Sequence, residues 1–235
     1  MPATPRAVLV DIDGTLLDSN YLHTVAWMRG FAAAGHVVPA WRIHRHMGMG
    51  GDKLVAAVAG DEVEETHGDA VRERWEQEFD AMLPETRLVD GATDLLDALA
   101  AAGLQVVLAS SGRPRHADRA LRLLDAAERG LAWTTSEDVE QTKPHPELLQ
   151  VALGRVGASA GEALVIGDAV WDVEAASRLG IATVALLCGG FGRQELLDAG
   201  AVAAYDDPRD LQAHLGEALD STRTRHPGDA GSSPS

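Results

Sequence analysis

Two aspartates near the start of the chain have a spacing that suits chemistry. Asp11 and Asp13 follow residues 7–10, an apolar run short enough for a buried strand, and Gly14 then breaks the run. Carboxylates two residues apart at the end of a strand point to the same side. Burying like charges together is costly unless a divalent cation or a proton relay compensates them. The stretch therefore predicts a catalytic or metal site, with an ordinary turn rich in Asp and Gly as the alternative.

Polar side chains recur where other apolar runs end. Ser110 ends one such run, Asp168 and Asp172 follow another, and Lys143 precedes a predicted helix. Open α/β sheets bind ligands at the carboxyl ends of their strands, so Ser110 is expected on the same edge as Asp11. Each group also has an ordinary alternative. The serine would be a turn hydroxyl, the lysine a surface cation, and the two aspartates a helix cap and a solvated neighbour.

Continuous apolar runs alternate with helical segments over most of the chain, which predicts an α/β fold. Such strands are typical of a parallel sheet with helices on both faces. We therefore expect a Rossmann-like, doubly wound parallel sheet. The predicted strands are 7–10, 104–109, 131–134, 163–166, 181–187 and 202–204, and the predicted helices are 90–102, 114–127, 144–156, 170–179, 193–199 and 208–219.

One stretch interrupts this alternation, because residues 17–88 read as helices only. Apolar residues recur at helical spacing in 20–34, and further helices are predicted at 53–59 and 62–82. An all-helical insert after the first strand predicts a separate cap domain. The predicted domains are a core of residues 1–16 and 89–220, a cap of residues 17–88 and a disordered polar tail of residues 221–235.

The polar groups lie in four motifs that resemble those of the haloacid dehalogenase superfamily, a large group of mostly magnesium-dependent phosphatases. The motifs are DIDGTLLDS at Asp11, an apolar strand ending in Ser110, the Lys-Pro-x-Pro sequence at Lys143 and GDAVWD at Asp168. They follow the family's order and span most of the chain. The sequence is most similar to the capped branch that contains the phosphoglycolate phosphatases and β-phosphoglucomutases.

This resemblance implies a role for each group. Asp11 would attack phosphorus and form an aspartyl-phosphate, and Asp13 would protonate the leaving oxygen and later take a proton from water. Ser110 and Lys143 would stabilise the phosphoryl group. Mg²⁺ is the implied cofactor, with the backbone carbonyl of Asp13 among its ligands. The implied metal site comprises Asp11, Asp13, Asp168 and Asp172.

The implied activity is Mg²⁺-dependent hydrolysis of a small phosphorylated metabolite. Asp13 favours phosphoryl transfer, because the dehalogenases of the superfamily lack a second aspartate at this place. A sugar-phosphate mutase shares all four motifs and stays open. A non-catalytic binding protein would be expected to lose the nucleophile or the metal ligand, and both are present. A phosphonoacetaldehyde hydrolase would need a cap lysine as its amine, and Lys53 has no neighbour that would activate it.

Substrate choice is expected to lie in residues 43–54 of the insert. The glycines of this loop would let the chain face the active site, its cations suit an anionic leaving group, and Met47 and Met49 suit an apolar wall. The alternative is an ordinary turn between helices, with the methionines in the core of the insert. The predicted substrate-binding residues are Arg45, His46, Lys53, Ser111 and Arg113.

The composition excludes several classes of protein. The chain of 235 residues has a formal net charge of −16, which argues against nucleic-acid binding and against a polybasic membrane anchor. Hydrophobic residues make up 46%, which suits a globular core, and no apolar run is long enough to span a bilayer. Cys188 is the only cysteine, so an intrachain disulfide is impossible. We expect a soluble cytoplasmic protein that is a monomer or a homodimer.

Overall fold

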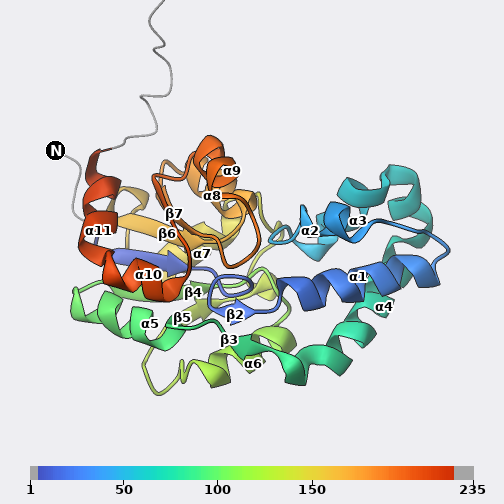
Figure 1. Ribbon diagram of the computed structural model, residues 1–235, viewed down its shortest axis with the longest axis horizontal. Coiled ribbons are helices and arrows are strands. Elements are labelled where there is room, and N and C mark those ends of the chain that lie inside the picture. The colour runs from blue at the N-terminus through green and yellow to red at the C-terminus, as the bar shows by residue number, and fades with distance from the viewer. Residues whose placement is uncertain (1–4, 225–235) are drawn as a thin grey trace, which may run out of the picture.

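The structure is a computed structural model that describes residues 5–224 of the chain. Within that range, six strands form one parallel sheet in the order β5-β4-β1-β6-β7-β8 (Figure 1). The predicted doubly wound α/β fold is confirmed. The strands are β1 (Ala7–Val10), β4 (Gln105–Ala109), β5 (Ala132–Thr134), β6 (Ala163–Gly167), β7 (Ala182–Leu186) and β8 (Ala203–Tyr205).

Strand β1 lies inside the sheet, at the place where the winding of the chain reverses. It pairs with β4 on one side and with β6 on the other, and all of its residues are buried. Open α/β sheets bind ligands at the carboxyl end of a strand at such a reversal. Asp11 is the first residue after β1, so the topology alone places it at this position.

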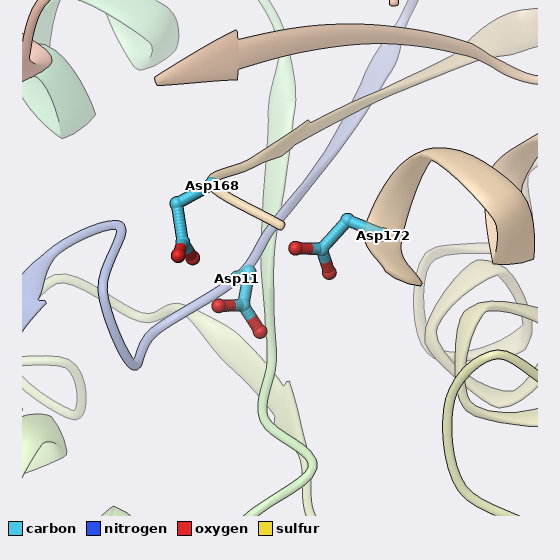
Figure 2. Close-up of side chains that lie close together, drawn as sticks. All are labelled: Asp11, Asp168 and Asp172. Atoms are coloured by element: carbon cyan, nitrogen blue, oxygen red, sulfur yellow. The ribbon is translucent and has the colours of Figure 1, made fainter. Parts of the chain in front are cut away.

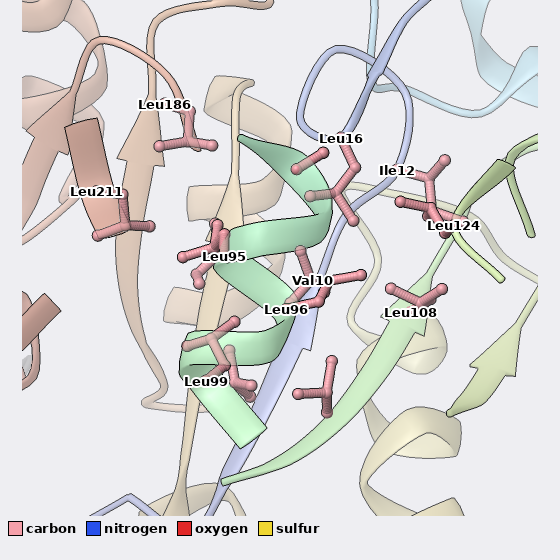
Figure 3. Packing of buried hydrophobic residues seen from close by; sticks show 14 of the residues in the cluster. Val10, Ile12, Leu16, Leu95, Leu96, Leu99, Leu108, Leu124, Leu186 and Leu211 are labelled. Carbon is pink, nitrogen blue, oxygen red and sulfur yellow. The ribbon is translucent and has the colours of Figure 1, made fainter. Parts of the chain in front are cut away.

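Helices cover both faces of the sheet. Val10 and Leu108 pack against one layer, which includes the leucines of α5 (Figure 3), whereas Leu9 and Val107 pack against the other. Successive strand residues therefore alternate between two hydrophobic cores. The first layer comprises α5 (Ala92–Ala101), α6 (Pro114–Leu123), α10 (Pro208–Ala213) and α11 (Leu215–Thr224), and the second comprises α7 (Glu147–Val156), α8 (Val170–Ser177) and α9 (Arg193–Ala199).

Two helices begin later than predicted, each for a local reason. α5 starts at Ala92 because Gly91 has a φ of +84°, which lies outside the helical region. α7 starts at Glu147 because His145 precedes Pro146, and a residue before proline avoids the helical conformation. Strong turn residues thus override the apolar periodicity at both places.

The C-terminal end also differs from the prediction. The last predicted helix is two helices, α10 and α11, and the second continues to Thr224. The predicted tail from residue 221 therefore begins too early, and its residues 225–235 lie outside the described range. No helix within residues 5–224 combines the length and apolar character needed to cross a membrane.

The sequence predicted an insert of helices only, but the insert after β1 also contains strands. Two short antiparallel strands, β2 (Leu17–Asp18) and β3 (Arg87–Leu88), frame it, and strands this short show no readable periodicity. Between them, the apolar side chains form a hydrophobic cluster of their own, which includes Trp27, Phe31 and Phe79. The helices are α1 (Asn20–Ala33), α2 (Ala40–His44), α3 (Gly51–Ala59) and α4 (Asp61–Met82), and they project to one side of the sheet (Figure 1).

Candidate active site

Asp11 and Lys143 form a buried ion pair at the carboxyl end of β1. The ammonium group of Lys143 donates to Asp11 Oδ1 and lies 2.7 Å from Asp172 Oδ1. The same nitrogen lies 3.4 Å from the carbonyl oxygen of Ala109, the last residue of β4. Only 1% of the lysine side chain is exposed, so its charge acts almost entirely on these partners. Three segments that are distant in the sequence meet at this one cation.

Asp168 completes a cluster of three acids with Asp11 and Asp172. One carboxylate oxygen from each residue lies within 4.8 Å of the other two, and all three residues are buried. Figure 2 shows the three groups converging from the end of β1, the end of β6 and the first turn of α8. Asp168 also accepts hydrogen bonds from Thr15 Oγ1 at 3.0 Å and from Asn20 Nδ2 at 2.8 Å. These bonds fix the orientation of its carboxylate.

Gly14 allows the chain to turn tightly over Asp168. It has a φ of +83°, which side chains of other residues rarely adopt. A Cβ at this position would lie 2.2 Å from Asn20 Nδ2 and 2.5 Å from Asp168 Oδ2. Only glycine therefore permits both the turn and the hydrogen bond between these two side chains.

The three acids carry more negative charge than Lys143 compensates. Burial raises the pKa of Asp11 to about 7, although the charge of Lys143 opposes the shift. Burial, and after it the charges of Asp11 and Asp172, raise the pKa of Asp168 well above its ordinary value. A divalent cation would compensate this excess, and a set of carboxylate oxygens is what Mg²⁺ prefers. The donor set therefore fits the cofactor that the sequence implied.

Asp13 lies beside polar groups of the insert. Its Oδ1 accepts a hydrogen bond from Ser19 Oγ at 2.6 Å and lies 3.6 Å from His23 Nε2. Burial favours a higher pKa for Asp13, but the hydrogen bond and charge of His23, followed by the hydrogen bond of Ser19, outweigh it and lower the pKa. The carboxylate of Asp13 is not part of the acid cluster.

The two serines after β4 lie on the same edge of the sheet. Ser110 is 1% exposed, and its Oγ accepts a hydrogen bond from the N–H of Gly112 at 3.0 Å. The Oγ of Ser111 is buried and has no hydrogen-bond partner within the described part of the chain. Both hydroxyl groups therefore keep a proton to donate to a ligand.

A cavity of about 450 Å³ extends from the sheet edge to the helices of the insert. Asp11, Asp13 and Ser111 line it on the side of the sheet. Small-molecule sites have volumes of about 300–1,000 Å³, so the cavity has room for a metabolite. The residues that line it from the insert are Asn20, His23, Trp27, Met47, Gly48, Met49, Gly51, Asp52, Leu54, Glu64, Arg72 and Trp75.

Comparison with known proteins agrees with this geometry. A family model of the haloacid dehalogenase-like hydrolases matches residues 5–180. The chain belongs to this family. It is 30% identical over 223 residues to the N-acetylmuramic acid 6-phosphate phosphatase of Pseudomonas aeruginosa, a match that covers 91% of this chain and 96% of that protein. It is 29% identical over 222 residues to the phosphoglycolate phosphatase of Rhodospirillum rubrum, with 90% and 91% covered.

The solved structures include close matches to this haloacid dehalogenase-like hydrolase. The crystal structure of a hydrolase from Pseudomonas syringae superposes with a TM-score of 0.85 and 34% sequence identity. The match covers 90% of this chain and 98% of that one, so it includes the helical insert as well as the sheet. The family that the four motifs indicated is therefore confirmed.

Three of the predicted substrate-binding residues of the hydrolase lie outside the cavity. Arg45 pairs with Glu195, and Lys53 Nζ donates to the carbonyl oxygen of Thr142 at 2.7 Å. The ring Nδ1 of His46 lies 2.8 Å from a backbone carbonyl oxygen in α2. None of the three belongs to the residues that line the cavity. Two of them instead connect the insert to the rest of the chain.

The other predicted residues do line the cavity. Ser111 lies at its sheet side, and Arg113 contributes while also pairing with Glu76 of α4 at 2.6 Å. Met47 and Met49, expected as an apolar wall, are lining residues as well. The loop between α2 and α3 therefore reaches the cavity through its apolar side chains rather than through its cations.

Several residues of the site were missed by the sequence analysis. Thr15 and Asn20 hold Asp168, and His23 contacts Asp13. Thr15 lies within the first motif, and Asn20 and His23 follow it closely, so their position was a usable signal. Glu64 and Arg72 lie far along the insert, where charged helical residues are ordinarily solvated, and no local signal marked them.

Proposed function

We propose that the protein is a Mg²⁺-dependent phosphatase that hydrolyses a small phosphomonoester through an aspartyl-phosphate on Asp11. The observation that carries this proposal is the buried pair of Asp11 and Lys143 at the carboxyl end of β1, in which Asp11 lines a cavity of metabolite size. The phosphatase names of the relatives from Pseudomonas aeruginosa and Rhodospirillum rubrum support it.

The residues suit the two displacements of such a reaction. A carboxylate oxygen of Asp11 attacks phosphorus, and the bond from phosphorus to the leaving oxygen breaks. Asp13 gives this oxygen a proton, and it then takes a proton from the water that hydrolyses the aspartyl-phosphate. The lowered pKa of Asp13 keeps its carboxylate ionised and so free to accept that proton, and a phosphate dianion nearby raises its proton affinity for the first step.

The remaining groups serve the phosphoryl charge and the metal ion. Lys143 holds Asp11 in place, and the hydroxyl of Ser110 can donate to a phosphoryl oxygen. Asp11, Asp168 and the backbone carbonyl of Asp13 would hold Mg²⁺, with Asp172 in support through Lys143. When bound, Mg²⁺ supplies positive charge to the phosphoryl oxygens.

We further propose that residues 17–88 act as a cap domain over a core of residues 1–16 and 89–220. Three observations support this division. The helices have a hydrophobic cluster of their own, the short strands β2 and β3 form the connection, and the cavity lies between the two parts. A cap that closes would exclude bulk water from the aspartyl-phosphate.

The test is release of inorganic phosphate from p-nitrophenyl phosphate and a panel of sugar phosphates and small acids, with Mg²⁺ and with EDTA. We expect release that needs the metal and that Asp11→Asn abolishes. Asp18→Asn is the matched control, because Asp18 is an exposed carboxylate close to Asp11 in the sequence. Interconversion of sugar phosphates without release would identify a mutase instead. Binding of Mg²⁺ and esters without any turnover would favour a binding protein.

A further inference from the structure

One polar pair lies on the helical wall of the cavity, which is the side that residues of the insert line. Arg72 of α4 contacts Glu64 through two nitrogens, with Nη1 donating to Oε2 at 2.9 Å and Nη2 lying 2.8 Å from Oε1. Nη2 also donates to Asp69 Oδ1 at 2.9 Å. Glu64 and Arg72 both line the cavity. A guanidinium and a carboxylate side by side can donate and accept hydrogen bonds at one place.

Gly68 leaves room for this pair on the surface of α4. Glu64, Gly68 and Arg72 follow one another at four-residue intervals, so they lie on the same face of α4. A Cβ at Gly68 would lie 2.8 Å from both Arg72 Nη2 and Glu64 Oε1. Glycine in a helix interior is unfavourable relative to alanine, and Gly68 is buried in the middle of the helix. The helix thus contains an unfavourable residue at the one place where the two side chains cross.

The charges around the pair are unsuited to a second anionic group on the substrate. Apart from Asp11 and Asp13, the acidic lining residues are Asp52, Glu64 and Glu140, and the basic ones are Arg72 and Arg113. Arg72 is engaged by Glu64 and Asp69, and Arg113 is engaged by Glu76. A carboxylate on the leaving group would therefore be desolvated without a free cation to receive it.

Most of the rest of the helical wall is apolar and aromatic, and its other polar residues, Asn20, His23 and Asp52, contact Asp168, Asp13 and Thr142. Trp27 and Trp75 stack on each other with ring centroids 4.7 Å apart, and Met47, Met49 and Leu54 continue the lining. With a volume of about 450 Å³, the cavity is far larger than a two-carbon acid requires. An apolar wall with one paired donor and acceptor suits a molecule that has hydroxyl groups and a carbon skeleton but no charge.

We infer that the leaving group is an uncharged polyhydroxylated carbon skeleton, such as a sugar or a polyol, whose hydroxyls bind the Glu64–Arg72 pair. This inference rests on the phosphatase function proposed above. Glu64 accepts from a substrate hydroxyl and keeps Arg72 neutralised, and the carbon skeleton packs along the wall that includes Trp75. The site consequently discriminates against phosphoesters whose leaving group carries a carboxylate.

Two phosphoesters with matching carbon chains test this inference on the Mg²⁺-loaded protein. Sorbitol 6-phosphate has a terminal alcohol where 6-phosphogluconate has a carboxylate. We expect kcat/KM to favour sorbitol 6-phosphate by about tenfold or more, because a buried unpaired charge is disfavoured. Glu64→Gln removes one of the two carboxylates that engage Arg72 and leaves Asp69 as its only anionic partner, so it should lower kcat/KM for the alcohol about tenfold and raise it for the acid. Glu65→Gln, an exposed neighbour on the same helix, should leave the ratio unchanged.

A second variant separates binding from folding. Gly68→Ala changes no charge and improves helix propensity, so it should keep or raise Tm while forcing the pair apart. We expect a loss of kcat/KM for sorbitol 6-phosphate of about tenfold at unchanged Tm. A preference for 6-phosphogluconate would overturn the inference, and so would a ratio of the two kcat/KM values that Glu64→Gln does not change. In either case, hydrolysis of p-nitrophenyl phosphate would still support the proposed phosphatase. Absence of hydrolysis of every ester would overturn both.

Discussion

The two walls of the cavity are built in different ways. On the sheet side, Asp11 lines the cavity, and Lys143 and Asp168 lie beside it. These polar groups come from strand ends and neighbouring turns and are deeply buried, with Asp11 6%, Lys143 1% and Asp168 1% exposed. On the helical side, one pair, Glu64 and Arg72, stands in a largely apolar wall. Buried charges depend on fixed partners, so the sheet wall tolerates few changes. The helical wall has fewer such constraints, which suits a surface that selects among substrates.

Polar contacts join the two walls at their rim, most of them between partly exposed side chains, whereas His116 is buried. Arg113 pairs with Glu76 at 2.6 Å, while Arg115 and His116 contact Asp80 at 2.9 and 3.1 Å. Ion pairs between partly exposed side chains contribute only about 0.2–1 kcal/mol each. The two arginine pairs of the rim therefore contribute little to holding the walls together. Substitutions in the sheet wall, its acid cluster and the rim should have effects of decreasing size.

The largest effect is expected in the sheet wall. Lys143→Met removes the cation between Asp11 and Asp172 and should lower kcat on the order of 10³-fold for every substrate alike. It should also lower Tm in EDTA, because it leaves two buried carboxylates without their partner. Phosphate release from p-nitrophenyl phosphate and from sorbitol 6-phosphate measures the loss, and a thermal scan measures the stability.

The chain offers a matched control for this variant. Lys53 is the only other lysine, and it contacts a backbone carbonyl in the segment that leads to Lys143. Lys53→Met should therefore change activity by only a few-fold, because Lys53 does not line the cavity. Equal losses in the two variants would contradict the separation of the walls, since a lysine of the insert would then matter as much as the buried one.

The sequence was sufficient to predict the sheet wall. Its residues follow short apolar strands, and parallel strands bring their carboxyl ends to one edge, so Asp11, Ser110 and Asp168 could be placed together without a structure. Lys143 was less predictable from spacing, because its side chain crosses from a loop to reach Asp11. Its motif, rather than its distance along the chain, identified it.

The helical wall could not be predicted in the same way. The cations at Arg45 and Lys53 looked suitable for substrate, but long side chains can turn in several directions, and these two contact other parts of the chain. The pair of Glu64 and Arg72 depends on the space above Gly68, which only the packed helix reveals. The sequence pattern of a charged helix face does not distinguish a face that borders solvent from one that borders a cavity.

A smaller effect concerns the stability of the acid cluster. The pKa of Asp11 rises from an ordinary 3.8 to about 7 in the folded protein, so the folded state binds more protons between these values. The metal-free protein should therefore lose stability as the pH rises through this window. Asp11→Asn has a neutral side chain at every pH. In EDTA, the Tm of this variant minus the Tm of the original protein should therefore increase by on the order of 5 °C between about pH 4 and about pH 7.

Asp18→Asn and Mg²⁺ sharpen this measurement. The exposed Asp18 should show no change of its Tm difference across the same window. Mg²⁺ should stabilise the original protein more at high than at low pH, since the metal competes with protons for the carboxylates. A constant Tm difference for Asp11→Asn at all pH values would mean that the sheet wall carries no uncompensated charge.

The smallest effect is expected at the rim, where the two walls meet. Asp80→Asn weakens the contacts of α4 with Arg115 and His116, and burial already holds the pKa of His116 below its ordinary value. KM for sorbitol 6-phosphate should rise about two- to fivefold, and the rise should shrink at high salt because the pair is screened. Asp118→Asn, an exposed acid of α6, serves as the control. A loss of kcat comparable to that of Lys143→Met would show that closure and chemistry are one process, so that neither wall could change independently of the other.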